Sequence, residues 1–94
     1  MIPDSYKGNT RTGLGEEEID LHGLTVDEAI PKLDEFIYKA YKSGHLRVWV
    51  VHGKGSGILR QEVRRYLSKH SLVRIQRPAD PYHGGSGATQ VELQ

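Results

Sequence analysis

Asp20 and His22, near the start of the chain, have side-chain types that together can transfer protons. They lie in the alternating segment Ile19-Asp20-Leu21-His22, which is typical of a β-strand, so both side chains leave from the same face of the strand. A carboxylate beside an imidazole can fix the tautomer of the ring and raise its basicity. The spacing therefore indicates an acid–base pair, and the alternative is a histidine that only ends the strand.

A second candidate is the glycine-rich segment His52-Gly53-Lys54-Gly55-Ser56-Gly57, which follows an apolar run and precedes a helical pattern. Glycines let the backbone approach an oxyanion closely, and the amides of a helix N-terminus together with Lys54 favour negative charge. The segment is not a Walker A loop, because no Lys-Ser/Thr pair follows its last glycine. With Arg60 one turn later, it predicts a phosphate-binding loop; a tight turn without a ligand is the alternative.

Charge is distributed unevenly, although the net charge is only +1. Residues 16–35 are rich in acids, whereas residues 54–77 hold seven lysines and arginines against a single acid. Such asymmetry is typical of a polyanion binder. Arg60, Arg64 and Arg65 occupy adjoining helical positions where like charges repel, and bound phosphates would relieve that repulsion. They are candidate phosphate contacts, with a solvated helix face as the alternative.

Four strands and two helices are expected to position these residues. The strands are predicted over residues 19–22, 46–51, 72–77 and 88–93. The first helix should open with a capping box at Thr25 and Glu28 and end at Gly44, and the second should run from about residue 58 to 69. Pro31 should kink the first turns of the first helix, because it removes one backbone hydrogen bond.

The order of these elements predicts where the candidate residues meet. Strand–helix–strand–helix–strand implies right-handed crossovers and three parallel strands, whereas the loop over residues 78–87 is too short for another helical crossover, so the fourth strand should be antiparallel. The carboxyl ends of the first three strands then share one edge, where open α/β sheets bind ligands. His22, His52 and His83 should therefore converge there, and the other two histidines should lie at the opposite end.

Three histidines and Asp20 on one edge raise the question of a metal. Their side-chain types suit zinc or a similar ion, but no short-spaced ligand motif is present, so we predict no cofactor and leave a divalent metal open. Two imidazoles beside an RNA phosphate could remove the 2′-hydroxyl proton and protonate the leaving 5′-oxygen. DNA lacks that hydroxyl, and its cleavage would need an activated water, usually on a metal. The chemistry favours RNA and leaves DNA nicking open.

Length and composition bound the remaining possibilities. A chain of 94 residues is expected to form one domain with a shallow cleft, which favours a polymeric ligand. Cysteine is absent from the sequence, which excludes a disulfide framework and thiolate metal ligands. Residues 1–17 are rich in glycine, threonine and charge and are interpreted as a flexible arm or linker before a domain over 18–94. Neither a signal peptide nor a membrane span is evident, so the expectation is a cytoplasmic protein without a membrane partner.

Three segments resemble the signatures of the Smr (small MutS-related) domain family over roughly residues 18–94. They are Asp20-Leu21-His22-Gly23, His52-Gly53-Lys54-Gly55-x-Gly57 and Gly84-Gly85-x-Gly87-Ala88-Thr89. The resemblance implies an α/β two-layer sandwich, a four-stranded mixed sheet with two helices in the order β-α-β-α-β-β, similar to the C-terminal domain of a bacterial translation initiation factor.

The resemblance also implies a function. It indicates a sequence-tolerant endonuclease acting on RNA or DNA, in DNA repair, recombination or ribosome rescue, with nucleic acid and the ribosome as partners. The alternative is a non-catalytic module that binds nucleic acid or ribosomes. Oligomeric state stays open.

The resemblance carries roles to individual residues. Asp20 and His22 match the family's Asp-x-His element, associated with cleavage, and His52 belongs to its second motif, so these three are the predicted catalytic residues. MutS-linked members often carry arginine at the position of His22, so the histidine resembles the nuclease-competent form. The predicted contacts to phosphate or nucleic acid are Gly53, Lys54, Gly55, Ser56, Gly57, Arg60, Arg64, Arg65, His83 and Gly85.

Overall fold

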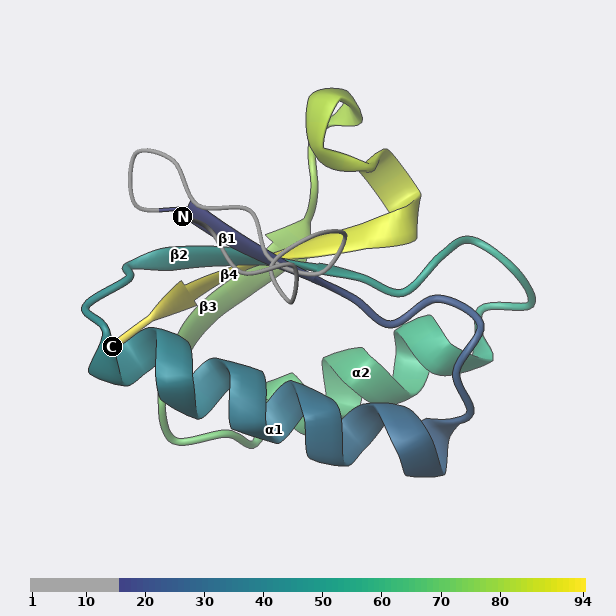
Figure 1. The fold of residues 1–94 in the computed structure, drawn as a ribbon. Helices are drawn as coiled ribbons and strands as arrows, with labels where there is room; N and C mark the ends of the chain where they lie inside the picture. Colours follow the sequence, from purple (N-terminus) through teal and green to yellow (C-terminus); the bar gives the residue numbers. More distant parts are fainter. Residues whose placement is uncertain (1–15) are drawn as a thin grey trace, which may run out of the picture.

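The computed structural model describes residues 16–94 and arranges them as four strands and two α-helices (Figure 1). The elements are β1 (Glu16–Asp20), α1 (Val26–Lys42), β2 (Arg47–Val51), α2 (Ile58–Ser68), β3 (Val73–Pro78) and β4 (Ala88–Leu93), with the short 3-10 helices η2 (Pro81–His83) and η3 (Gly85–Gly87) between the last two strands. Residues 1–15 of the arm predicted over 1–17 lie outside the described residues. Residues 16 and 17 belong to β1, so the sheet begins two residues before the predicted domain start.

The sheet has the strand order β1-β2-β4-β3. β1 pairs with β2 in parallel, and β4 is antiparallel to both β2 and β3. This confirms that β1, β2 and β3 run in one direction and that β4 opposes them. The strand order adds what the sequence did not indicate: β4 folds back from β3 and lies between it and β2.

Both helices cover one face of this sheet, which gives the predicted two-layer α/β sandwich (Figure 1). The core between the layers is formed by buried apolar side chains: Leu21, Ala29, Leu33, Ile37, Ala40, Val48, Val50, Val63, Leu67, Val91 and Leu93. Trp49 faces the side of the sheet that carries no helix, where it packs with Ala79, just after β3, and Ala88, at the start of β4. This explains the continuous apolar run of β2, since both of its faces are covered.

The helix ends follow local sequence rules. Thr25 caps α1 with the predicted capping box, in which Thr25 Oγ1 accepts from the Glu28 amide at 3.2 Å and Glu28 Oε1 accepts from the Thr25 amide at 3.0 Å. α1 continues through Pro31 as one helix of 17 residues. Within residues 16–94, neither helix is long and apolar enough to reach across a bilayer.

Leu21 anchors the end of β1 in the core. Its side chain is 0% exposed, and its amide donates to the Val51 carbonyl at 2.6 Å, which continues the β1–β2 pairing by one residue. Because side chains alternate along a strand, burying Leu21 directs Asp20 away from the helices. The predicted strand over 19–22 ends at Asp20, and His22 lies in the turn that follows, where Asp20 holds it. The core thereby fixes the position of the candidate acid–base pair.

Truncating this anchor should destabilise the whole domain. Leu21→Ala should lower the free energy of unfolding by about 3 kcal/mol, because it removes buried methyl groups and leaves a cavity. Leu21→Met, which conserves volume, should cost less than about 1.5 kcal/mol. Urea denaturation followed by circular dichroism measures both. Equal losses for the two variants would contradict the anchoring role.

Candidate functional site

The three predicted signatures meet at one edge of the sheet, at the carboxyl ends of β1, β2 and β3 (Figure 1). The amides of His52 and Gly53 both donate to the Gly87 carbonyl, at 3.0 and 2.9 Å. Gly53 also lies against the first signature, since a β-carbon added to it would stand 3.3 Å from the β-carbon of His22. The backbone at Gly53 is therefore the point at which the three segments touch.

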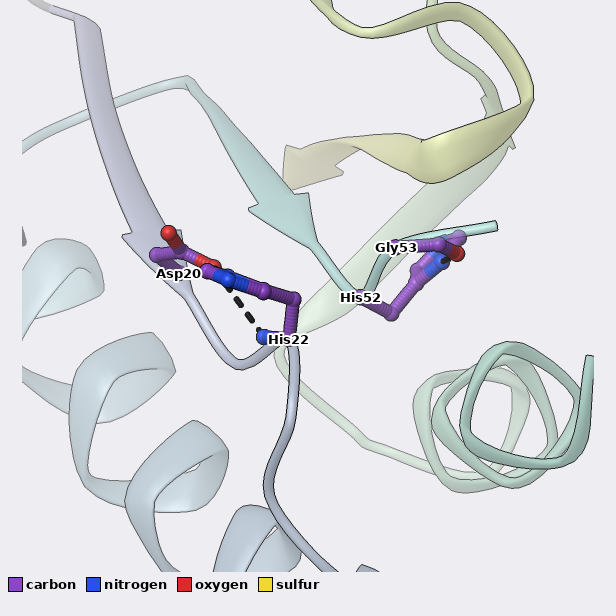
Figure 2. Close-up of polar contacts among 4 residues, drawn as sticks. All are labelled: Asp20, His22, His52 and Gly53. Atoms are coloured by element: carbon purple, nitrogen blue, oxygen red, sulfur yellow. Dashed lines mark hydrogen bonds and ion pairs between the residues drawn. The ribbon is translucent and has the colours of Figure 1, made fainter. Parts of the chain in front are cut away.

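Asp20 orients His22. One carboxylate oxygen, Oδ1, accepts from the His22 amide at 3.0 Å and lies 2.6 Å from ring nitrogen Nδ1 (Figure 2). An ionised carboxylate can only accept, so Nδ1 carries the proton and Nε2 is left to exchange a proton with a ligand. The His22 side chain is 68% exposed, so a polymer on the surface can reach it. This is the geometry of an accessible general base or acid.

His52 has a different environment. It is only 4% exposed, and Figure 2 shows its ring directed toward Gly53 while the His22 ring is directed toward Asp20. His52 Nδ1 donates to the Gly53 carbonyl at 3.0 Å, and Nε2 lies 2.9 Å from Thr89 Oγ1. Burial lowers the pKa of His52; the Gly53 carbonyl opposes this shift, and the positive charges of Arg64 and Arg60 add to it. His52 is therefore a neutral imidazole whose two nitrogens are both engaged.

A polar cleft of about 380 Å³ opens at the N-terminus of α2. It is lined by Ser56, Gly57, Ile58, Arg60, Gln61 and Arg64. Gly57 begins the helix with φ +89°, a left-handed conformation that favours glycine, and the first turn of α2 contains no acid. The positive end of the helix dipole and two guanidinium groups thus face the same cleft, a combination suited to phosphate.

Lys54, on the loop that leads into α2, lies next to the last glycine signature. Lys54 is exposed, and its Cγ would lie 3.3 Å from a β-carbon added to Gly87. Gly55 is also exposed on the same loop, and Gly85 takes a left-handed backbone with φ +54°. A larger residue at Gly87 would therefore press on the stem of Lys54.

Arg65 is separated from the other two arginines. It lines a groove of about 530 Å³ between α1 and α2, together with Ile30, Tyr66 and Lys69, and its guanidinium lies 3.9 Å from Glu62. The physical reason is the helical turn of about 100° per residue, which rotates Arg65 away from Arg64. The structure thus places Arg60 and Arg64 in one cleft and Arg65 in another.

His83 lies over the face of the sheet that carries no helix. Its ring stacks on Trp49 with centroids 4.4 Å apart, and its Nδ1 lies 2.9 Å from Asp80 Oδ1. The hydrogen bond from His83 holds the pKa of the Asp80 carboxyl below its ordinary value. Within residues 16–94, no three His, Cys, Asp or Glu side chains gather closely enough to hold a metal ion. His22 and His52 follow the ends of β1 and β2, whereas His83 lies over the sheet face against Trp49, so the three candidate histidines do not gather at one place.

Two residues of the site were not among the predicted contacts. Thr89 is fully buried between His52 and Arg64, and Gly87 supplies the carbonyl that fixes the His52–Gly53 turn. A sequence signal for Thr89 does exist, because it alternates with Val91 and Leu93 on the core face of β4. A polar side chain at such a position requires a hydrogen-bond partner.

Comparison with known proteins places this geometry in context. The family model for the Smr domain matches residues 19–94. "Endonuclease MutS2" of Thermomicrobium roseum is 46% identical over 79 residues, which are 84% of this chain and 10% of that protein. "Endonuclease MutS2" of Clostridium botulinum is 39% identical over 93 residues, 99% of this chain and 12% of that protein. The chain spans about a tenth of the length of these curated relatives.

Solved structures show the same fold. The Smr domain of Thermus thermophilus MutS2 matches with a TM-score of 0.79 and 40% identity, covering 82% of this chain and 96% of that one. YdaL, a stand-alone small MutS-related protein from Escherichia coli, matches with a TM-score of 0.78 and 34% identity, covering 82% of this chain and 63% of that one. Both similarities confirm the predicted α/β fold.

The burial of His52 predicts how stability depends on pH. An unfolded histidine titrates near about pH 6.5, and the folded pKa is lower, so the unfolded chain binds more protons between these two values. The contribution of neutral His52 to stability is therefore present above about pH 6.5 and is lost as pH falls toward the folded pKa.

Urea denaturation of wild type and His52→Gln between pH 8 and 5 measures this contribution. The difference in free energy of unfolding between them should shrink as pH falls, because the other titrating groups are common to both proteins. A difference that stays constant or grows on acidification would contradict a buried neutral His52.

Proposed function

Because this chain belongs to the Smr domain family, we propose that it is a sequence-tolerant endonuclease module that cuts the nucleic-acid backbone beside His22. The observation that carries the proposal is an exposed imidazole oriented by Asp20 and packed against the glycine loop through Gly53. The relatives named Endonuclease MutS2 support it.

RNA is the proposed substrate. His22 Nε2 removes the proton of a 2′-hydroxyl, and the 2′-oxygen attacks the adjacent phosphorus. The bond from phosphorus to the 5′-oxygen then breaks, leaving a 2′,3′-cyclic phosphate, and the departing 5′-oxygen takes a proton from water. The hydroxide formed takes back the proton held by His22, whose side chain is 68% exposed and so open to that water. Asp20 keeps Nδ1 protonated and stabilises the imidazolium that forms.

The phosphate is held by the neighbouring loop and helix. Lys54, Arg60 and Arg64 supply positive charge, and the amides at the start of α2 supply hydrogen-bond donors. None of these groups reads a base edge, so recognition through the backbone should tolerate any sequence. His83 and Gly85, in the loop over the sheet face, are proposed as further contacts to the strand. We assign His52 the role of holding the loop, since its ring is engaged.

The biological setting follows from the family resemblance. Ribosome rescue, DNA repair and recombination are the proposed processes, with RNA, DNA or the ribosome as partner and the cytoplasm as the place. DNA nicking would require an activated water, usually on a divalent metal, which the RNA reaction does not need.

A non-catalytic binding module is the second candidate, and one observation favours it. The cleft of Arg60 and Arg64 is complete without His22, so phosphate binding does not depend on the acid–base pair. Binding and cleavage are therefore separable by experiment.

The catalytic proposal predicts that His22→Ala lowers RNA cleavage by at least about 100-fold, because general acid–base catalysis contributes on this scale. Labelled RNA and plasmid DNA incubated with purified protein give the rates. His45→Gln, a histidine at the other end of the sheet, serves as the matched control and should cut as wild type does. Wild type that cuts neither substrate would leave the binding module as the function, and His22→Ala that cuts as fast as wild type would show that His22 is not the catalytic residue.

The proposed chemistry also predicts the product and the cofactor requirement. Cleavage of RNA should continue in the presence of a chelator and leave a 2′,3′-cyclic phosphate, because the nucleophile is the substrate's own hydroxyl. End-group determination by mass spectrometry detects the cyclic phosphate. Activity that disappears with chelator and returns with a divalent ion would replace this mechanism with a metal-dependent one.

Backbone recognition predicts a salt-dependent affinity. With about three phosphate contacts, from Lys54, Arg60 and Arg64, the slope of log affinity against log salt should be about −2 to −3. Lys54→Gln should flatten this slope by about one and weaken binding to all sequences alike. Lys39→Gln removes the same charge from α1, where Lys39 pairs with Glu35, and should leave the slope unchanged. Fluorescence anisotropy on two unrelated oligonucleotides measures it; equal effects of both variants would mean that Lys54 contributes only net charge.

A further inference from the structure

Thr89 is a hydroxyl buried where three elements meet. It lies on the core face of β4 with 0% exposure, and its Oγ1 is 2.9 Å from Nε2 of His52. The same oxygen accepts from Nε of Arg64, on α2, at 3.3 Å. Thr89 therefore joins the loop that follows β2 to the helix that lines the phosphate cleft.

The direction of each hydrogen bond follows from what each group can do. The Gly53 carbonyl only accepts, so His52 Nδ1 must donate to it, and the neutral ring then accepts at Nε2. The Arg64 guanidinium only donates. Thr89 consequently accepts from Arg64 and donates to His52, forming one chain from Arg64 to the Gly53 carbonyl. A hydroxyl can fill this place, and a methyl group of the same size cannot.

The two ends of this series of hydrogen bonds lie in the two halves of the proposed site. At one end, His52 holds the peptide of Gly53, which has φ +85° and packs against the β-carbon of His22. At the other end, Arg64 is tied through Nε, and its side chain lines the cleft at the start of α2. A change at Thr89 therefore reaches His22 through the backbone and the phosphate through Arg64.

We propose that Thr89 is a positioning residue for cleavage, whose hydroxyl fixes His52 and Arg64 together so that Gly53 supports His22 and Arg64 reaches the phosphate. The proposal rests on the function proposed above and names a residue that never touches the substrate. Its effect is expected in both binding and turnover, since the two ends of the chain serve different steps.

Thr89→Val and Thr89→Ser test the hydroxyl, because valine keeps the branched shape and serine keeps the oxygen. Thr89→Val should lower kcat/KM on RNA by about 10- to 100-fold, through a higher KM and a lower kcat, since small misplacements of reacting groups have effects of this size. Thr89→Ser should stay within about threefold of wild type. The proposal would be overturned if Thr89→Val cut RNA with the kcat/KM of wild type, or if Thr89→Ser lost as much kcat/KM as Thr89→Val.

Nuclear magnetic resonance gives a readout that does not depend on cleavage. In Thr89→Val the amide resonances of Gly53 and Lys54 and the Nε2 resonance of His52 should shift, while Thr89→Ser should leave them near their wild-type positions. A residue that merely fills space would show the opposite pattern, because valine fills it better than serine. Should wild type prove not to cut RNA, the proposed nuclease function fails, and these resonances still decide whether Thr89 positions the loop.

Arg64→Lys probes the other end of the hydrogen-bonded series. Arg64 is half-buried, so its substitution is less disruptive to folding than substitution of the buried Thr89. Lysine keeps the positive charge but lacks the Nε that Thr89 holds. Affinity for an RNA oligonucleotide should fall several-fold although the charge is unchanged. Unaltered affinity, measured by anisotropy at fixed salt, would show that Thr89 does not direct Arg64.

Discussion

The close approach of the backbone at Gly53 is the constraint on which this site depends. Two consecutive amides, of His52 and Gly53, share the Gly87 carbonyl, and the α-carbon of Gly53 lies against the side chain of His22. A φ of +85° and a neighbour 3.3 Å from any added β-carbon both favour glycine at this position. One peptide thus joins the turn that carries His22 to the loop that carries Lys54.

The sheet provides this contact with a rigid base. Leu21, Val48 and Val50 are fully buried beneath the helices, so the strand ends that carry Asp20 and His52 have little freedom. His22 lies outward beside the Asp20 carboxylate, and His52 lies inward beside Thr89. The two histidines at this edge of the sheet therefore differ in their chemistry. Environment, and not residue type, determines which of them can act on a ligand.

Much of this arrangement could be predicted from the sequence because the signals are local. The capping box at Thr25, the alternation around Asp20 and the short connection before β4 each follow from neighbouring residues. The position of β4 between β2 and β3, the burial of His52 and the separation of Arg65 from Arg64 depend on contacts between distant segments. Spacing alone could not distinguish an exposed histidine from a buried one, since both follow strands and both precede glycine.

A DNA strand that contains a single ribonucleotide tests the central claim most directly, since it offers one 2′-hydroxyl among otherwise identical phosphates. If His22 activates that hydroxyl, the protein should cut only at the phosphate on the 3′ side of the ribonucleotide, and His22→Ala should leave the strand intact. Cleavage spread over the deoxynucleotide positions, or a strand left whole by wild type under conditions in which it binds, would contradict the account.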